Sequence, residues 1–154
     1  LQTLECPLWG PIEAKVYVVI NDQPIYTDEY AITIKAELKE DFSKMTVEEL
    51  QQAPIVEVKI PNLDTLKANK KYNARLTISN AGINPLAIRR IITSDETITI
   101  TAPKATIKGG RKTDINMLIN TAGLESGNYS RMVTIITNDP KKSILKLSLN
   151  WVVE

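Results

Sequence analysis

The sequence predicts an all-β fold, and three observations support this prediction. Residues 144–153 alternate apolar and polar side chains, so that Leu145, Leu147, Leu149 and Trp151 fall on one face of a half-buried strand. Turn-forming residues recur about every 8 to 12 positions between short apolar runs. Only residues 46–52 carry a helical pattern, which disfavours an α/β architecture.

The clearest local element is a β-hairpin over residues 127–153. Its first run, Met132 to Thr137, is rich in β-branched residues, and its second run is the alternating segment 144–153. Asn138-Asp139-Pro140-Lys141-Lys142 lies between them and supplies turn chemistry. The chain is therefore expected to end in two paired antiparallel strands.

The same pattern occurs earlier in the chain. Aligning Gly10 with Gly127 places Asn21-Asp22 on Asn138-Asp139 without a gap, at an offset of 117 residues (138 minus 21). The alignment also places Val16 on Val133 and Val18 on Ile135, and after a longer turn it places Ile32, Ile34 and Ala36 on Leu145, Leu147 and Leu149. A repeat at this spacing predicts that residues 1–39 are the closing hairpin of a partial first domain, whose front half is absent. The alternative is that any two hairpins resemble one another.

Residues 40–53 are predicted to be a linker with a short helix. Thr46-Val47-Glu48-Glu49 forms a capping box, and Pro54 ends the helical turns. Residues 54–154 then hold about seven short strands, which is typical of a complete immunoglobulin-like β-sandwich. The expected core residues are Val58, Tyr72, Leu76, Ile78, Leu86, Ile88, Ile115, Met117, Ile119, Val133, Ile135, Leu147, Leu149 and Trp151.

Composition argues against an enzyme. The 154 residues include no histidine and a single cysteine, Cys6, so the commonest general base, Cys-His pairs and Cys-based zinc sites are all missing. No Gly-rich phosphate loop follows a strand, and Gly109-Gly110 is a plain turn pair. We therefore expect no catalytic residues, no cofactor and no metal.

Several motifs resemble an uncharacterised family of bacterial immunoglobulin-like domains. These motifs are Leu76-Thr77-Ile78-Ser79-Asn80-Ala81-Gly82, Pro85-Leu86-Ala87-Ile88, Gly127 and Thr137-Asn138-Asp139-Pro140. The family is common in Bacteroidetes envelope proteins, occurs in tandem copies, and is related to ASH/Hydin and major-sperm-protein-like domains. The resemblance implies a periplasmic, cell-surface or secreted location, although the chain shows no signal peptide. A Cys-Gly-Cys element found in relatives is replaced here by Thr93-Ser94-Asp95-Glu96-Thr97.

Charge and aromatic residues suggest weak binding candidates. Residues 1–53 carry a balance of −6 and residues 54–154 a balance of +7. The candidate basic patch consists of Arg89, Arg90, Lys104, Lys108, Arg111 and Lys112. This patch could contact an anionic polysaccharide or an acidic protein surface, or it could be a solvated rim that discourages strand pairing. Trp9 could stack on a sugar, whereas Trp151 shares the apolar face of its strand and should be buried.

The function expected from the sequence is a non-catalytic structural or protein-interaction module of a bacterial envelope or secreted protein. The alternative is a carbohydrate-binding accessory domain, which an exposed aromatic platform would favour. Expected partners are other protein domains, including a second copy of the chain in a homodimer through the N-terminal hairpin, and possible polysaccharide. No nucleic acid is expected, since no aromatic residues interleave with the basic ones, and no membrane-spanning segment is expected.

Overall fold

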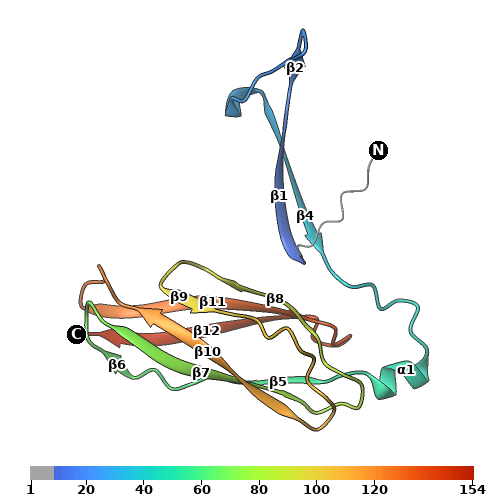
Figure 1. Cartoon of the computed structure of the whole chain (residues 1–154), viewed down its shortest axis with the longest axis vertical. Helices are drawn as coiled ribbons and strands as arrows, with labels where there is room; N and C mark the ends of the chain where they lie inside the picture. The colour runs from blue at the N-terminus through green and yellow to red at the C-terminus, as the bar shows by residue number, and fades with distance from the viewer. Residues whose placement is uncertain (1–8) are drawn as a thin grey trace. The chain divides into compact units, whose positions relative to one another are not determined.

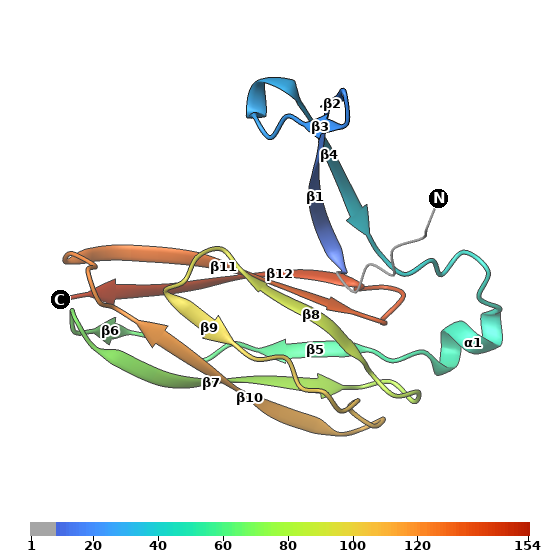
Figure 2. The same cartoon turned by 45° about the horizontal axis from the view of Figure 1, so that its top comes forward.

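The computed structural model describes residues 9–154, and Cys6 lies outside them. The chain divides into two compact units, one up to Lys39 and one from Glu40 to Glu154. The first unit is a β-hairpin, and the second is a two-sheet sandwich preceded by one short helix (Figures 1 and 2). The predicted fold class is confirmed. No helix in the described part of the chain is long and apolar enough to cross a membrane.

The sandwich consists of two four-stranded sheets. The first sheet has the order β5-β7-β10-β9, with the bounds Val56–Lys59, Lys71–Asn80, Lys112–Asn120 and Ile98–Ile100. The second has the order β6-β12-β11-β8, with the bounds Thr65–Leu66, Ile144–Val153, Gly127–Thr137 and Ile88–Thr93. All neighbours are antiparallel except β6 and β12. The chain segment that holds β5 and β6 thus contributes one strand to each sheet. The strand order of the two sheets is immunoglobulin-like.

The inner faces of the two sheets form one aliphatic core. Ten of the fourteen predicted core residues are buried, and Val58, Tyr72, Ile88 and Leu147 are partly buried and pack against them. The prediction missed buried members that lie on short strands, in loops and at the end of β12. These are Val56, Leu63, Leu66, Ile98, Ile107 and Val153.

Strand β8 contains an irregularity that the alternation pattern did not indicate. Ile136 lies opposite Arg90, but the next residue, Thr137, lies opposite Ile88. Arg89 is therefore the extra residue of a β-bulge. The extra residue shifts the inward-outward alternation of side chains along β8 by one position. As a result Ile88 and Ile91, three residues apart, both pack against the core, and Arg89 projects outward.

The linker helix α1, Val47–Gln52, is capped as predicted. The Glu49 amide donates to the Thr46 hydroxyl (3.2 Å), and the Thr46 amide donates to the Glu49 carboxylate (2.8 Å). These two bonds satisfy amides that the first helical turn cannot pair internally.

Two buried side chains fasten the chain where it enters the sandwich. The Ile55 amide donates to Oδ1 of Asn80 (3.2 Å), and the next amide, that of Val56, donates to Oδ2 of Asp139 (2.8 Å). Gly82 lies so close that an added Cβ would stand 2.2 Å from the Ala53 carbonyl oxygen. Only glycine fits that close approach. The Asn80-Ala81-Gly82 motif and the Asn138-Asp139 turn therefore both contact the chain at the start of β5 and hold it in place.

A cation–aromatic cluster ties β11 to the loop before β9. Arg131 forms an ion pair with Asp95, and its guanidinium lies 5.4 Å from the ring centre of Tyr129 and 6.0 Å from that of Trp151. Burial opposes ionisation of Asp95, but hydrogen bonds from Thr97 and the charge of Arg131 outweigh it, so the pKa of this carboxyl is lowered.

The first unit pairs β1, Gly10–Tyr17, with β4, Ala31–Leu38. Its distal end carries a small ladder of β2, Val19–Ile20, and β3, Gln23–Pro24, followed by a 3-10 turn at Asp28–Tyr30. Asn21 and Asp22 form the two-residue turn between β2 and β3 with φ of 49° and 60°. Asn and Asp tolerate this left-handed conformation, which a type I′ hairpin turn requires at both positions.

The register corrects the sequence alignment of the second strand. Val16 lies opposite Ile32, whereas its counterpart Val133 lies opposite Leu147. Ile32 therefore corresponds to Leu147, Ile34 to Leu149 and Leu38 to Val153, a shift of two residues from the expected match. A shift of two leaves every side chain on the same face, so the alternation could not reveal the error.

We expect Leu149→Ala to destabilise the sandwich by about 2–5 kcal/mol, because Leu149 is fully buried and its truncation leaves a cavity. Urea unfolding followed by circular dichroism measures the loss. Lys146→Ala, on the exposed face of the same strand, is the control and should change stability by less than about 0.5 kcal/mol. Equal effects of the two substitutions would contradict the assigned inward face.

Asp139→Ala should cost about 1–3 kcal/mol, because it leaves the buried Val56 amide without an acceptor. Hydrogen exchange at Val56 should accelerate more than exchange at the centre of β7. The matched control is Asp114→Ala, which removes an exposed carboxylate bonded to Thr77. An unchanged Val56 exchange rate would show that Asp139 does not hold the entry of β5.

The stability difference between the wild type and Asp95→Asn should depend on pH. Because the folded-state pKa of Asp95 is lowered, its ionised carboxylate, held by Thr97 and Arg131, stabilises the fold above the ordinary pKa of 3.8, and this contribution is lost as pH falls through the lower folded-state value. The variant should be less stable at neutral pH, and the stabilities of the two proteins should converge as pH falls below the lowered folded-state pKa. Thermal unfolding of both proteins, from neutral to acid pH, measures this stability difference. Glu96→Gln is the control, because Glu96 is the exposed neighbour of Asp95. A stability difference that persists at the acid end would refute the prediction.

Candidate functional site

The β1–β4 hairpin has one apolar and one polar face. We define the apolar hairpin face by the side chains that the register places together, namely Ile12, Ala14, Val16, Ile32, Ile34, Ala36 and Leu38. The opposite face carries the charges: Lys35 pairs with Glu13 (3.4 Å), and Lys15 pairs with Asp28 (2.7 Å). The hydrogen bond and charge of Asp28 raise the pKa of Lys15. Both lysines of the polar face are thus paired with a carboxylate.

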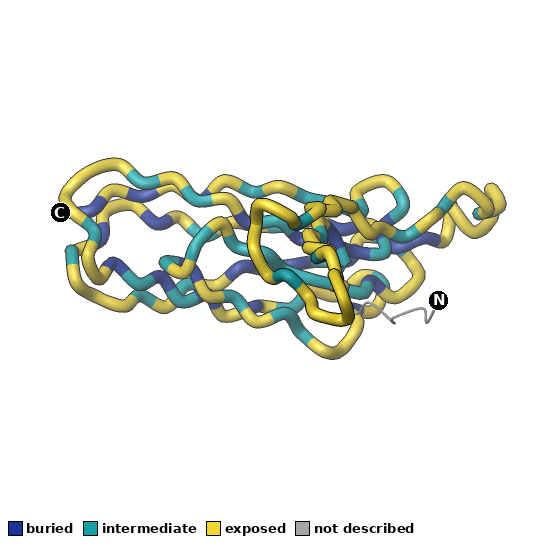
Figure 3. The backbone as a smooth tube through the Cα atoms, turned by 90° about the horizontal axis from the view of Figure 1, so that it is seen from above, coloured by how far each residue is buried: buried dark blue, intermediate teal, exposed yellow. Residues whose placement is uncertain are grey.

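The apolar hairpin face is open, whereas the equivalent face of the sandwich is covered. Val16 is 49% exposed and Ile34 is 51% exposed, while their counterparts Val133 and Leu149 are each 1% exposed. Figure 3 shows the hairpin as mostly exposed tube. Aliphatic side chains in this pattern are normally packed against a second sheet, so this face is the candidate interaction surface of the protein.

The hairpin's edges are also unpaired within the described residues. The sheet contains only β1 and β4, whereas in the sandwich β8 pairs with the outer edge of β11 and β6 pairs with that of β12. Two strands alone cannot bury a face, so an isolated hairpin of this kind is marginal in water.

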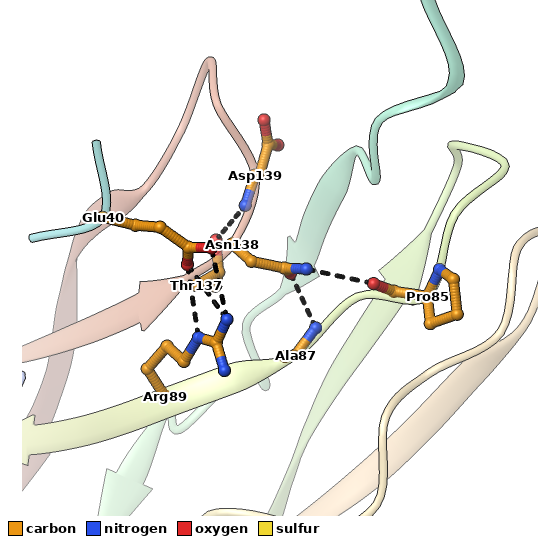
Figure 4. A network of polar contacts seen from close by, with 7 residues as sticks. All are labelled: Glu40, Pro85, Ala87, Arg89, Thr137, Asn138 and Asp139. Carbon is orange, nitrogen blue, oxygen red and sulfur yellow. Dashed lines mark hydrogen bonds and ion pairs between the residues drawn. The ribbon is translucent and has the colours of Figure 1, made fainter. Parts of the chain in front are cut away.

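The repeated Asn-Asp dipeptide has different surroundings in the two hairpins. In the sandwich, Oδ1 of Asn138 accepts from the Ala87 amide (2.7 Å) and its Nδ2 donates to the Pro85 carbonyl (3.1 Å), as Figure 4 shows. Its neighbour Asp139 is buried and accepts from the Val56 amide. The counterparts Asn21 and Asp22 are exposed. Sequence reasoning identified both pairs as turn chemistry and missed that the second pair fastens two other segments.

The structure divides the six basic candidates between the two sheets. Lys112 begins β10 and Arg111 precedes it, and both line one groove together with Lys108. Lys104 is exposed in the loop before them. Glu57 lines an adjoining groove that Arg111 and Lys112 share, so an acid lies among these bases. The other two candidates, Arg89 and Arg90, lie on β8 of the second sheet. An anionic ligand for this patch stays a prediction.

Arg89 is engaged within its own unit. Its guanidinium donates to both carboxylate oxygens of Glu40, at 3.1 to 3.3 Å, as Figure 4 also shows. This ion pair connects the bulge of β8 to the first residue of the linker. A structural role therefore accounts for Arg89 without a ligand.

The aromatic candidates do not form a platform in the sandwich. Trp151 is buried, as predicted, and its ring stacks with that of Tyr129 at a centroid distance of 6.1 Å. Trp9 is partly buried. The large exposed apolar side chains of the described sandwich unit are aliphatic residues and Met132, none of them aromatic. Among residues 9–154, no three His, Cys, Asp or Glu side chains gather as metal ligands would.

Comparison with known proteins extends this description. The fold is similar to a protein of unknown function from Porphyromonas gingivalis W83, with a TM-score of 0.66 and 15% identity, over 94% of this chain and 66% of that one. It is also similar to the secreted serine protease VesC from Vibrio cholerae, with a TM-score of 0.50 and 15% identity, over 70% of this chain and 24% of that one. An ASH/PapD-like domain of human CEP192 matches at 0.44 and 9% identity, over 77% of this chain and 95% of that one.

No curated protein matches the chain in sequence. A family model described as "Protein of unknown function (DUF1573)" matches residues 55–152, from the fastened entry of β5 to the last but one residue of β12. Because that match covers more than half of the chain, the protein belongs to the DUF1573 family.

Proposed function

We propose that this chain is a non-catalytic structural and protein-interaction module of a bacterial envelope or secreted protein. The observation that carries the proposal is the apolar hairpin face, since side chains of this kind and spacing bind another protein sheet and offer nothing to a reaction. The resemblance to tandem immunoglobulin-like domains of envelope proteins supports the setting, as does the fold shared with VesC, which is itself a secreted protease.

The repeat supports an arrangement of such domains in a row. The β1–β4 hairpin matches the β11–β12 hairpin in register, in its apolar face and in the Asn-Asp dipeptide. Along the chain, a capped helix at residues 47–52 lies between the β1–β4 hairpin and the strands of the sandwich.

A protein partner accounts for these surfaces better than a sugar does. Sugars are held by exposed aromatic rings, and in the sandwich Trp151 is buried among core residues. The groove of Lys108, Arg111 and Lys112 is where an anionic polysaccharide could bind the sandwich, and exposed aromatic rings lie in the hairpin unit at Tyr26 and Tyr30.

A bacterial polysaccharide array tests the proposal. We expect no saturable binding by the wild type. The decisive variants are Arg111→Glu, within the groove, and Lys141→Glu, an exposed control outside it. Saturable binding to one glycan class that Arg111→Glu abolishes and Lys141→Glu preserves would replace the interaction module with a carbohydrate-binding domain.

A further inference from the structure

From the edge of β10 we infer that the sandwich binds an extended, acidic segment of another polypeptide, which adds as a strand beside the first half of β10. The inference rests on the proposed function and deepens it, since it names a second binding surface and the chemistry of its partner. β10 pairs with β7 along its whole length, Lys112–Asn120, but with β9 only from Met117 to Ile119. Among the described residues, no strand lies beside the edge of β10 before Met117.

Backbone hydrogen-bonding groups point into this space. In an antiparallel sheet, the backbone groups of alternate residues face opposite neighbouring strands. The Asn120 amide donates to the Thr97 carbonyl (2.8 Å), on the β9 side of the strand. Counting back two residues at a time, the amides on this same side are those of Lys112, Asp114 and Asn116. Within residues 9–154, these three amides and the carbonyls of the first two have no hydrogen-bond partner, and we call them the open edge of β10.

Pro103 explains why β9 does not continue along the open edge. If the register of β9 on β10 continued, Pro103 would lie opposite Asp114, where a backbone N–H has to donate to the Asp114 carbonyl. Proline has no N–H, so pairing ends before it, and Figures 1 and 2 show the connection from β9 to β10 as coil. A segment without proline can make the hydrogen bonds that this part of the chain cannot make.

Two hollows lie along the open edge. One, of about 360 Å³, is lined by residues 101–103 and by residues 114–116 of β10. The other, of about 320 Å³, is lined by residues 103, 105–108 and 111–113, so Pro103 borders both. Hollows of this size admit side chains as well as water. The inward side chains of an added strand would meet Ile115 and Ile107, and its outward side chains would lie beside Lys112.

The charges along the groove favour an acidic partner. Lys108, Arg111 and Lys112 line the second hollow, and no carboxylate is among its lining residues. Among residues 9–154, none of these three side chains forms an ion pair. Opposite charges directly across two strands are stabilising, and like charges are destabilising. We therefore expect a carboxylate opposite Lys112, no carboxylate opposite Asp114, and an apolar side chain at the inward position between them.

Amide hydrogen exchange of the full chain, followed by NMR, tests the open edge. The amides of Lys112, Asp114 and Asn116 should exchange about tenfold faster, or more, than those of the residues between them, which donate to β7. Thr113 and Ile115 are these interleaved residues. Equal protection of the two sets would show that the edge is already paired, and this result would overturn the inference.

Peptide selection on the immobilised full chain tests the partner. The probe is a displayed library of random peptides of about nine residues, long enough for one strand. Enriched sequences should lack proline, alternate apolar with polar residues and carry Asp or Glu. The tightest of them, made as a free peptide, should protect the amides of the open edge from exchange. A selection without enrichment would overturn the inference, as would a peptide that binds without protecting these amides.

Backbone methylation of the selected peptide separates strand addition from attraction of charges alone. Methyl groups on the nitrogens of one alternate set of residues should weaken binding about tenfold or more, whereas methyl groups on the other set should have little effect. Only one edge of the added strand faces β10, so equal effects of the two sets would contradict strand addition.

Lys112→Glu should weaken binding of the acidic peptide by about tenfold or more, because it places like charges across the two strands. Lys71→Glu is the matched control, since Lys71 is exposed and lies at the other end of the β7–β10 ladder, opposite Asn120. Equal weakening by the two substitutions would overturn the assignment to this groove. The polysaccharide array uses no peptide, so failure of strand addition and failure of the interaction module are distinguishable.

Discussion

The sandwich depends on how the chain is held at the start of β5. Two consecutive amides, those of Ile55 and Val56, donate to buried side chains from two different loops, Asn80 and Asp139. Both polar atoms of the Asn80 side chain form hydrogen bonds. Its Oδ1 accepts from Ile55, and its Nδ2 donates to the carbonyls of Asn84 (2.8 Å) and Ile107 (3.0 Å). A buried polar group without a partner would cost free energy, so each of these bonds requires the others to be in place.

This fastening gives a structural role to motif residues at the end of β7 and in the β11–β12 turn. Gly82 permits the close approach of Ala53, and Asn138 joins the segment before β8 to the β11–β12 turn. The aliphatic core tolerates exchange of one apolar residue for another of similar volume. A side-chain amide or carboxylate that satisfies a particular backbone amide has no such substitute. Conformation at one end of the sandwich is thus determined by a few polar residues.

The two hairpins show the same local pattern in different surroundings. Both have an apolar face, an Asn-Asp dipeptide and an opposite face of polar side chains. In the sandwich the face is covered by a second sheet, and the dipeptide is bonded to neighbouring strands. In the first unit the face is open, and the dipeptide forms an exposed left-handed turn. The face is open because the first unit, as described, contains only the two strands of this hairpin in its larger sheet.

Periodicity in the sequence determined the strands, the inward faces and the capped helix, because these features depend on neighbours within a few residues. Thr46 and Glu49 form their capping box as expected, and Leu149 and Trp151 are buried as their alternation predicted. Only the tertiary structure decided the pairing register, which differs by two residues from the alignment of the hairpins, and the bulge at Arg89. It also decided that Asp139, which resembles an ordinary turn residue, accepts from an amide 83 positions away. Such bonds depend on which segments meet in space, and a two-residue period carries no information about that.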